Sequence, residues 1–199
     1  MKKFILGYKL PMTQVFTKNG DMVGVTEIQA GPCEVTQVRT PDKDGYSAVQ
    51  IAFDAAKHVK KPQIRKDGKK YKHTAEFRTE ADADIKVGQT IDTGVFQPGD
   101  FVKVTGINKG RGFQGVVKRH GFRGGKKSHG HKDQLRMPGS LGDGGRQNVI
   151  KGRRMGGHMG NKQITVSNLE VVGVDVKRNV IQLKGAVPGA ISGLIRISM

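Results

Sequence analysis

Residues Phe101 to Lys132 read FVKVTGINKGRGFQGVVKRHGFRGGKKSHGHK, and the sequence changes character at Asn108. Before this point, Val102 and Val104 alternate with residues that can face solvent, which is the period of a half-buried β-strand. After it, glycine, lysine, arginine and histidine leave almost nothing for a hydrophobic core. The chain therefore passes here from β-structure into a segment of another kind.

The segment from Lys109 to Gln163 is basic and rich in glycine. Its 55 residues hold 14 Lys and Arg, 15 of the 29 glycines and two acids, Asp133 and Asp143, so about +12 of the net charge of +18 lies here. Ordering a residue costs roughly 1–2 kcal/mol, and this composition offers little apolar surface to offset that cost. We expect the segment to be extended or mobile until a partner orders it.

The flanking sequences are typical of short antiparallel strands separated by glycine and proline turns. Together they favour a closed or nearly closed β-barrel. The stretch DAAKHVKKPQIRKDGKKYKH (54–73) is expected to form a short helix and a basic loop, interrupted at Pro62, and Asp67 is the only acid between Lys57 and Lys72. The predicted strands are MVGVTEI (22–28), CEVTQV (33–38), AVQIAF (48–53), TIDTGVF (90–96), FVKVTGI (101–107), ITV (164–166), LEVVGVDV (169–176), VIQLKG (180–185) and LIRIS (194–198).

Composition limits the classes of partner. A net charge of +18 and a pI near 10.2 indicate that the binding partner is a polyanion. No apolar run reaches the roughly 18 residues of a membrane span. The apolar run in MKKFILGYKLP stops at Leu6, so we expect a mature cytoplasmic start and not a signal peptide. Cys33 is the only cysteine, which fits a reducing compartment and a packed small hydrophobe, with a reactive thiol as the alternative.

Two motifs resemble sites of other kinds, and a catalytic site is a further alternative. Gly110, Gly112 and Gly115 form G-x-G-x-x-G, but the glycines that follow break the helix a dinucleotide fold requires. The nearby histidines have no cysteine or acid at metal-ligand spacing. No nucleophile, base and orienting acid assemble in the basic region. We therefore expect no catalytic residue, no metal, no cofactor and no small-molecule substrate.

The basic segment favours nucleic acid. Lysine and arginine neutralise phosphates, and glycine lets the backbone approach closely. Phe113 and Phe122 can stack on unpaired nucleobases. Alternatively, they can pack the start of the segment against the barrel. His120, His129 and His131 can stack or donate to phosphates, with uncharged loop residues as the alternative.

The motifs TGINKGRGFQGVVKRHGFRGG, RMPGSLG, KGRRMGGHMGNKQITVSNLEVV and LKGAVPG resemble the large-subunit ribosomal protein L3 family, as do GYKLPMTQVF and DKDGYSAVQIAF. The resemblance implies a mainly β fold with a small α+β part: a translation-protein-type antiparallel barrel, an inserted α+β subdomain and a long basic extension. The expected division is barrel (1–44), α+β insertion with the basic loop (45–88), barrel (89–108), extended rRNA-threading loop (109–163) and barrel (164–199).

The same resemblance implies a structural constituent of the large subunit, located in the cytoplasm. It would bind large-subunit rRNA near the 3′ end, nucleate assembly and send the extension toward the peptidyl transferase centre. Its partners would be that rRNA and neighbouring ribosomal proteins, with no membrane. Pro11, Asn108 and residues 143–150 depart from the family's usual pattern.

Charge and resemblance together select the candidate rRNA contacts. Motif position selects Lys109, Arg111, Lys118, Arg119, His120, Arg123, His129, Arg136, Arg153, Arg154, Asn161 and Lys162, and residue type adds Phe113, Lys126, Lys127, His131, Lys132, Arg146 and Lys151. A secondary contact, with a solvated face as the alternative, comprises Lys57, Lys60, Lys61, Arg65, Lys69 and Lys70. A free-standing RNA chaperone or architectural nucleic-acid binder is the second interpretation of the chain, and an RNA-directed enzyme is the third.

Overall fold

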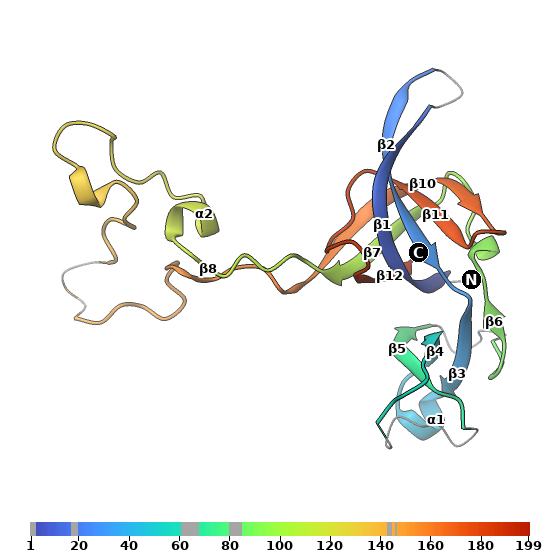
Figure 1. Ribbon diagram of the computed structural model, residues 1–199. Coiled ribbons are helices and arrows are strands. Elements are labelled where there is room, and N and C mark those ends of the chain that lie inside the picture. Colours follow the sequence, from blue (N-terminus) through green and yellow to red (C-terminus); the bar gives the residue numbers. More distant parts are fainter. Residues whose placement is uncertain (1–2, 17–19, 61–67, 80–84, 143–144, 146) are drawn as a thin grey trace. The chain divides into compact units, whose positions relative to one another are not determined.

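Six antiparallel strands pair around a closed barrel in the computed structural model, which describes residues 3–16, 20–60, 68–79, 85–142, 145 and 147–199 (Figure 1). Their burial alternates where one side faces the core, as in β7, where Val102 and Val104 are buried. The mainly β fold expected from the sequence is confirmed. The spatial order is β1 (Phe4–Phe16), β12 (Leu194–Ser198), β7 (Phe101–Ile107), β10 (Gln163–Asp175), β11 (Val180–Lys184) and β2 (Met22–Ala30), and β2 pairs back onto β1.

A second, smaller sheet has four antiparallel strands. In spatial order these are β5 (Tyr71–Arg78), β4 (Ala48–Ala55), β3 (Cys33–Arg39) and β6 (Thr90–Ile91). One helical turn, α1 (Pro41–Asp44), joins β3 to β4, with proline in its first turn and Gly45 ending it at φ 77°. A 3₁₀ turn, η2 (Thr93–Val95), follows β6. Proline fixes the φ that begins the turn and glycine adopts the left-handed φ that ends it.

One hydrophobic core joins the barrel and the smaller sheet. The rings of Phe4 from β1 and Phe77 from β5 stack with centroids 4.8 Å apart. Gly7 lies where a Cβ atom would stand 2.5 Å from the Gln29 carbonyl oxygen, so its lack of a side chain allows β1 and β2 to approach. Cys33 is buried in this core, which confirms the packed-hydrophobe interpretation. Burial raises the pKa of its thiol to about 11.

The structure differs from the sequence expectation in several strands and in one helix. Cys33–Arg39 belongs to the smaller sheet and not to the first barrel segment, because β3 pairs with β4 and β6. Residues 56–60 are neither helix nor strand, so the short helix was wrong; pairing with β5 extends β4 to Ala55 and overrides the helix propensity of the alanines. The strand expected over 90–96 is limited to Thr90–Ile91.

β1 was absent from the predicted strands. Its first four residues, Phe4 to Gly7, are all buried, and a continuously buried run lacks the alternation by which the other strands are identified. Pairing with β12 on one side and β2 on the other buries this run.

Residues Lys109–Lys162 form a second compact unit, and residues 1–108 and 163–199 form the first. Most described residues of the second unit lie outside helices and strands. Its regular elements are β8 (Phe113–Gln114) paired with β9 (Gly157–His158), the helix α2 (Val116–His120) and the 3₁₀ turn η3 (Lys132–Gln134). Gly121, at φ 72°, ends α2, as expected where the sequence turns from VVKRH to glycine.

Candidate nucleic-acid interface

Main-chain hydrogen bonds join the outgoing and returning arms of the second unit. The Arg111 N–H donates to the Met159 carbonyl at 2.8 Å, and the Met159 N–H donates to the Gly112 carbonyl at 2.9 Å. Beside them, Gly160 is buried at φ +80°, and a Cβ atom there would overlap the Lys109 carbonyl oxygen. The close crossing of the arms therefore requires glycine at 160.

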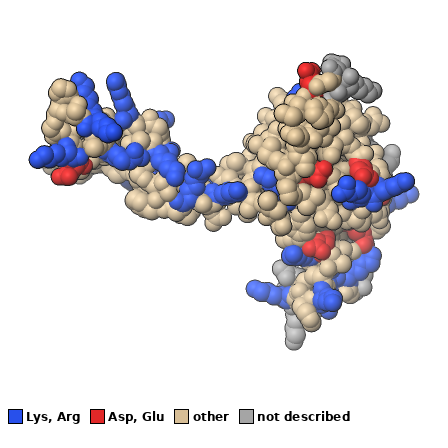
Figure 2. All heavy atoms as spheres, turned by 45° about the horizontal axis from the view of Figure 1, so that its top comes forward, with Lys and Arg blue, Asp and Glu red and all other residues tan. Residues whose placement is uncertain are grey.

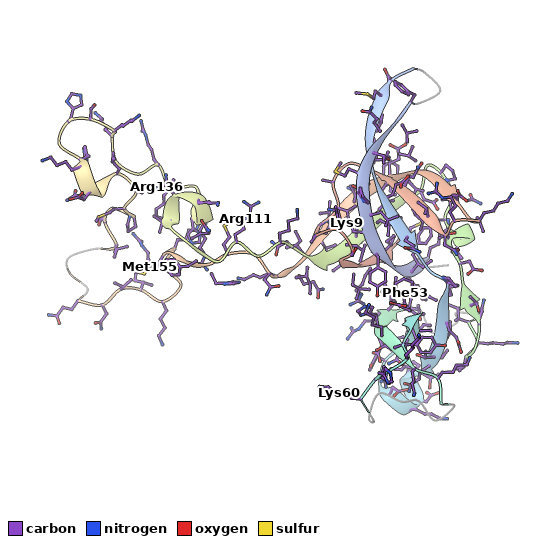
Figure 3. The ribbon with its side chains drawn as sticks, viewed as in Figure 1. Lys9, Phe53, Lys60, Arg111, Arg136 and Met155 are labelled. Carbon is purple, nitrogen blue, oxygen red and sulfur yellow. The ribbon has the colours of Figure 1, made fainter. Side chains whose placement is uncertain are left out.

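Two side chains of α2 contact the returning arm of this unit at Met155. The Arg119 Nη1 donates to the Met155 carbonyl at 2.8 Å, and His120 Nε2 lies 3.0 Å from the same oxygen. Figure 3 labels Met155 on the returning arm. Arg119 also lies against Gly157, where a Cβ atom would stand 2.6 Å from its Nη1. These two predicted RNA contacts are half-buried and bond within their own unit.

Farther along the chain, a loop closes on itself around a hollow of about 730 Å³. The Gly125 N–H donates to the Leu135 carbonyl at 2.9 Å. Phe122, Arg123 and His131 are among the residues that line the hollow. Aromatic, guanidinium and imidazole groups in a concave surface suit an unpaired base and its phosphate.

Most of the predicted cations of this unit are exposed, and Figure 2 shows Lys and Arg spread along it. Figure 3 labels Arg111 and Arg136 among them. Exposed are Lys109, Arg111, Lys118, Arg123, Lys126, Lys127, Lys132, Arg136, Lys151, Arg153, Arg154 and Lys162, together with His129 and Asn161. His131 is half-buried, and Arg146 lies outside the described residues.

Two exposed side chains of this unit, Arg153 and Phe113, have further features. Arg153 Nη2 donates to the Ser140 carbonyl at 2.9 Å, and this hydrogen bond connects the returning arm to the loop that contains Ser140. Phe113 is 79% exposed, whereas Phe122 is half-buried with its ring centroid 6.0 Å from that of His120. The exposure of Phe113 favours stacking on a base over packing within the protein.

The secondary basic run is only partly described. Lys57, Lys60 and Lys69 are exposed and Lys70 is half-buried, while Lys61 and Arg65 lie outside the described residues. The Lys69 ammonium lies 2.6 Å from Glu34 Oε1, so part of its charge is already met by an acid of β3. This contact favours the solvated-face interpretation for Lys69.

A cationic hollow on the first unit was not predicted. Arg78, Lys103 and Arg196 line about 370 Å³ between β5, β7 and β12, with Lys3 beside them. Arg196 is positioned by a 2.6 Å hydrogen bond from Nη2 to the Glu76 carbonyl. Its guanidinium also lies 4.8 Å from the centroid of the Phe77 ring.

The acids near this hollow are paired with basic residues, and one of these, Lys3, lines the hollow itself. Arg39 hydrogen bonds to the Glu76 carboxylate and lowers its pKa, and Lys3 does the same for Asp100. Nothing in the local sequence marks the hollow, because its cations come from strands far apart in the chain.

A second cleft on the first unit has the opposite character. It measures about 450 Å³ and includes Glu34 and Asp54, whose carboxylates accept hydrogen bonds from Tyr71 and Tyr8. The Tyr8 hydroxyl is the main cause of a lowered pKa at Asp54. Lys69 and Lys72 pair with these two carboxylates at 2.6 and 3.5 Å, and no described lysine or arginine lines the cleft, so it offers little attraction for phosphate.

The described residues contain neither a metal-binding cluster nor a helix suited to span a membrane. There, no three His, Cys, Asp or Glu side chains are grouped so that they could share a metal ion. No helix in the described ranges has the length and apolar character needed to cross a membrane.

Comparison with known proteins gives close relatives over nearly the full chain. The profile of a family described as Ribosomal protein L3 matches residues 51–178. A large ribosomal subunit protein uL3 from Roseiflexus sp. (strain RS-1) is 49% identical over 199 residues, which cover 97% of this chain and 95% of the relative. Another uL3, from Herpetosiphon aurantiacus, is 50% identical over 98% of this chain and 94% of its own length. A third, from Pelotomaculum thermopropionicum, is 48% identical over 99% and 96%.

Proposed function

The chain belongs to the ribosomal protein L3 family, and from this premise we propose that it is a structural constituent of the large ribosomal subunit that binds large-subunit rRNA directly. It works in the cytoplasm as part of the ribosome and has neighbouring ribosomal proteins as partners. The observation that carries the proposal is the row of exposed cations on a unit whose sequence contains only two acids.

The second unit supplies most of the rRNA contacts in this proposal. Its exposed lysines and arginines neutralise phosphates, whereas Arg119 and His120 position the returning arm through the Met155 carbonyl. The unit extends toward the peptidyl transferase centre, and the protein binds near the 3′ end of the rRNA and nucleates assembly. It shapes the RNA and performs no chemistry.

In this proposal, the first unit anchors the protein to the large subunit. We assign residues 1–44, 89–108 and 164–199 mainly to a translation-protein-type barrel and residues 45–88 to an inserted subdomain, with β3 joining the latter by its strand pairing. The cationic hollow of Arg78, Lys103 and Arg196 adds a phosphate contact on this unit.

A salt wash tests the main proposal. An integral constituent remains with purified large subunits when the salt concentration is raised, whereas a free-standing RNA chaperone dissociates, because its contacts are electrostatic and few. Loss of the protein from otherwise intact subunits at moderate salt would favour the chaperone.

Directed RNA cleavage tests the path of the second unit. Cys33 is buried with a raised pKa, so an iron chelate attaches selectively to an introduced cysteine such as Arg136→Cys. We expect cleavage of rRNA near the catalytic centre from Arg136→Cys and at different nucleotides from Lys43→Cys on α1. Identical cleavage patterns, or cleavage only at the subunit surface, would contradict the proposed path.

A further inference from the structure

β1 and β2 continue beyond the barrel as a two-stranded ribbon, which we define as residues 12–16 and 22–24 (Figure 1). β12 pairs with β1 only over Phe4–Tyr8, and β11 pairs with β2 only over Val25–Gln29. Among the described strands, the two strands of the ribbon therefore pair only with each other. Each leaves an outer edge without a described strand partner, although the Gly185 N–H donates to the Gly24 carbonyl at 2.9 Å.

The pairing register collects large apolar side chains on one face of the ribbon. Phe16 lies opposite Met22, Gln14 opposite Gly24, and Met12 opposite Thr26. Because directly opposed residues share a face and successive residues alternate, Phe16, Met22 and Met12 point to the same side. They are 68%, 61% and 52% exposed.

The two faces of the ribbon differ. On the other face, Val15 lies opposite Val23, and both are half-buried. On the apolar face, a Cβ atom added at Gly24 would meet nothing within 4 Å, so the space beside Gln14 is open. The apolar face is thus exposed, open and one-sided, which is the character of an interaction surface rather than of scattered surface hydrophobes.

Charge decides which class of partner fits this face. Residues 12–24 contain one cation, Lys18, and one acid, Asp21, in a chain of net charge +18. A surface that binds RNA needs cations to neutralise phosphates, and this one has no excess of them. A second copy of the chain would bring two charges of +18 together, which disfavours self-association. The remaining class is a different protein.

We propose that the face formed by Met12, Phe16 and Met22 docks against an apolar surface of a second, different protein of the large subunit. The inference rests on the proposed function, since it assumes the protein is assembled in that subunit. Methionine side chains adapt their shape to a partner and phenylalanine supplies a rigid apolar anchor. In the ribbon, the outer edge of β1 has no strand partner among the described residues, so a strand of the same partner can pair with it.

A photo-crosslinker at position 16 tests the proposal. Phe16 is replaced by p-benzoylphenylalanine in the full chain, the variant is assembled into large subunits, and the irradiated adducts are identified by mass spectrometry. We expect an adduct with a peptide of another ribosomal protein. The same group at Thr13, on the opposite face of the ribbon, should give at least fivefold less of that adduct.

The other outcomes overturn the proposal in distinguishable ways. An adduct with RNA alone, or with a second copy of the chain, in subunits that retain the protein after a salt wash would refute the docking surface and leave the proposed function intact. Failure of the unmodified chain to remain with the subunit would refute the proposed function, and the docking proposal with it.

A double variant, Phe16→Ser with Met22→Ser, supplies the second measurement. Both side chains are exposed and outside the core, so the variant should fold with an unchanged thermal midpoint. We expect its affinity for isolated rRNA to stay within twofold of the parent, while recovery of the crosslinked neighbour with the subunit falls at least tenfold. Unchanged recovery of that neighbour, or an rRNA affinity that falls tenfold, would overturn the docking surface. Thr13→Ala is the matched control.

Discussion

Substitution of Gly160 by alanine should weaken rRNA binding strongly without unfolding the barrel. The residue has φ +80°, and the new Cβ atom would overlap the Lys109 carbonyl oxygen and stand 3.0 Å from Gly110 Cα. Left-handed backbone costs a non-glycine residue about 1–2 kcal/mol. Separating the arms also breaks the two hydrogen bonds between Arg111, Gly112 and Met159, worth about 0.5–1.5 kcal/mol each.

The sum for Gly160→Ala is about 2–5 kcal/mol, which corresponds to a rise in Kd of roughly 30-fold to a few thousand-fold. Two glycines of the same unit provide a graded series. Gly112, at φ +65°, has nothing within 4 Å of an added Cβ atom, so Gly112→Ala should carry the backbone strain alone, roughly 5- to 30-fold. Gly142 has neither a left-handed φ nor a close neighbour, so Gly142→Ala should be neutral.

The assay is equilibrium binding of each full-length variant to a large-subunit rRNA fragment, with the thermal midpoint of the barrel measured in parallel. Because Gly160 belongs to the second unit, the barrel midpoint should not change. Equal affinities for Gly160→Ala and Gly142→Ala would refute the argument that the crossing of the arms positions the RNA contacts.

Three further predictions concern charge, a side-chain clamp and pH. Lys103→Gln should weaken rRNA binding and reduce the slope of log affinity against log salt by about 1, whereas Lys177→Gln on an exposed turn should change neither. Arg119→Lys keeps the charge but loses the guanidinium contact with the Met155 carbonyl, so the affinity should fall roughly 2- to 10-fold at an unchanged salt slope. The pKa of Cys33 is raised to about 11 in the folded chain. The unfolded chain therefore loses this proton first as pH rises, and stability falls between about pH 9 and 11. Denaturant unfolding of Cys33→Ala should lack this alkaline loss of up to about 3 kcal/mol, and parallel pH profiles for parent and variant would contradict it.

The sequence alone determined the strands with clear alternation and the segment that lacks a core. Val102 and Val104 identify β7 because a half-buried strand imposes a period of two, and the structure has the strand over the predicted residues. The cations and glycines after Asn108 identify the RNA-binding candidate because charge and composition are local properties. Because these properties are local, they did not predict which cations are available to RNA and which bond within the protein.

Tertiary structure decided what depends on partners distant in the chain. Alternation says which face of a strand is buried but not which strand lies beside it, so only the pairing with β4 and β6 assigns Cys33–Arg39 to the smaller sheet. Arg119 and Arg136 are the same residue type in the same basic segment. Yet Arg119 donates a hydrogen bond to the Met155 carbonyl, whereas Arg136 is exposed. The hollow of Arg78, Lys103 and Arg196 exists only because long-range pairing brings β5, β7 and β12 together, and no local pattern encodes that proximity.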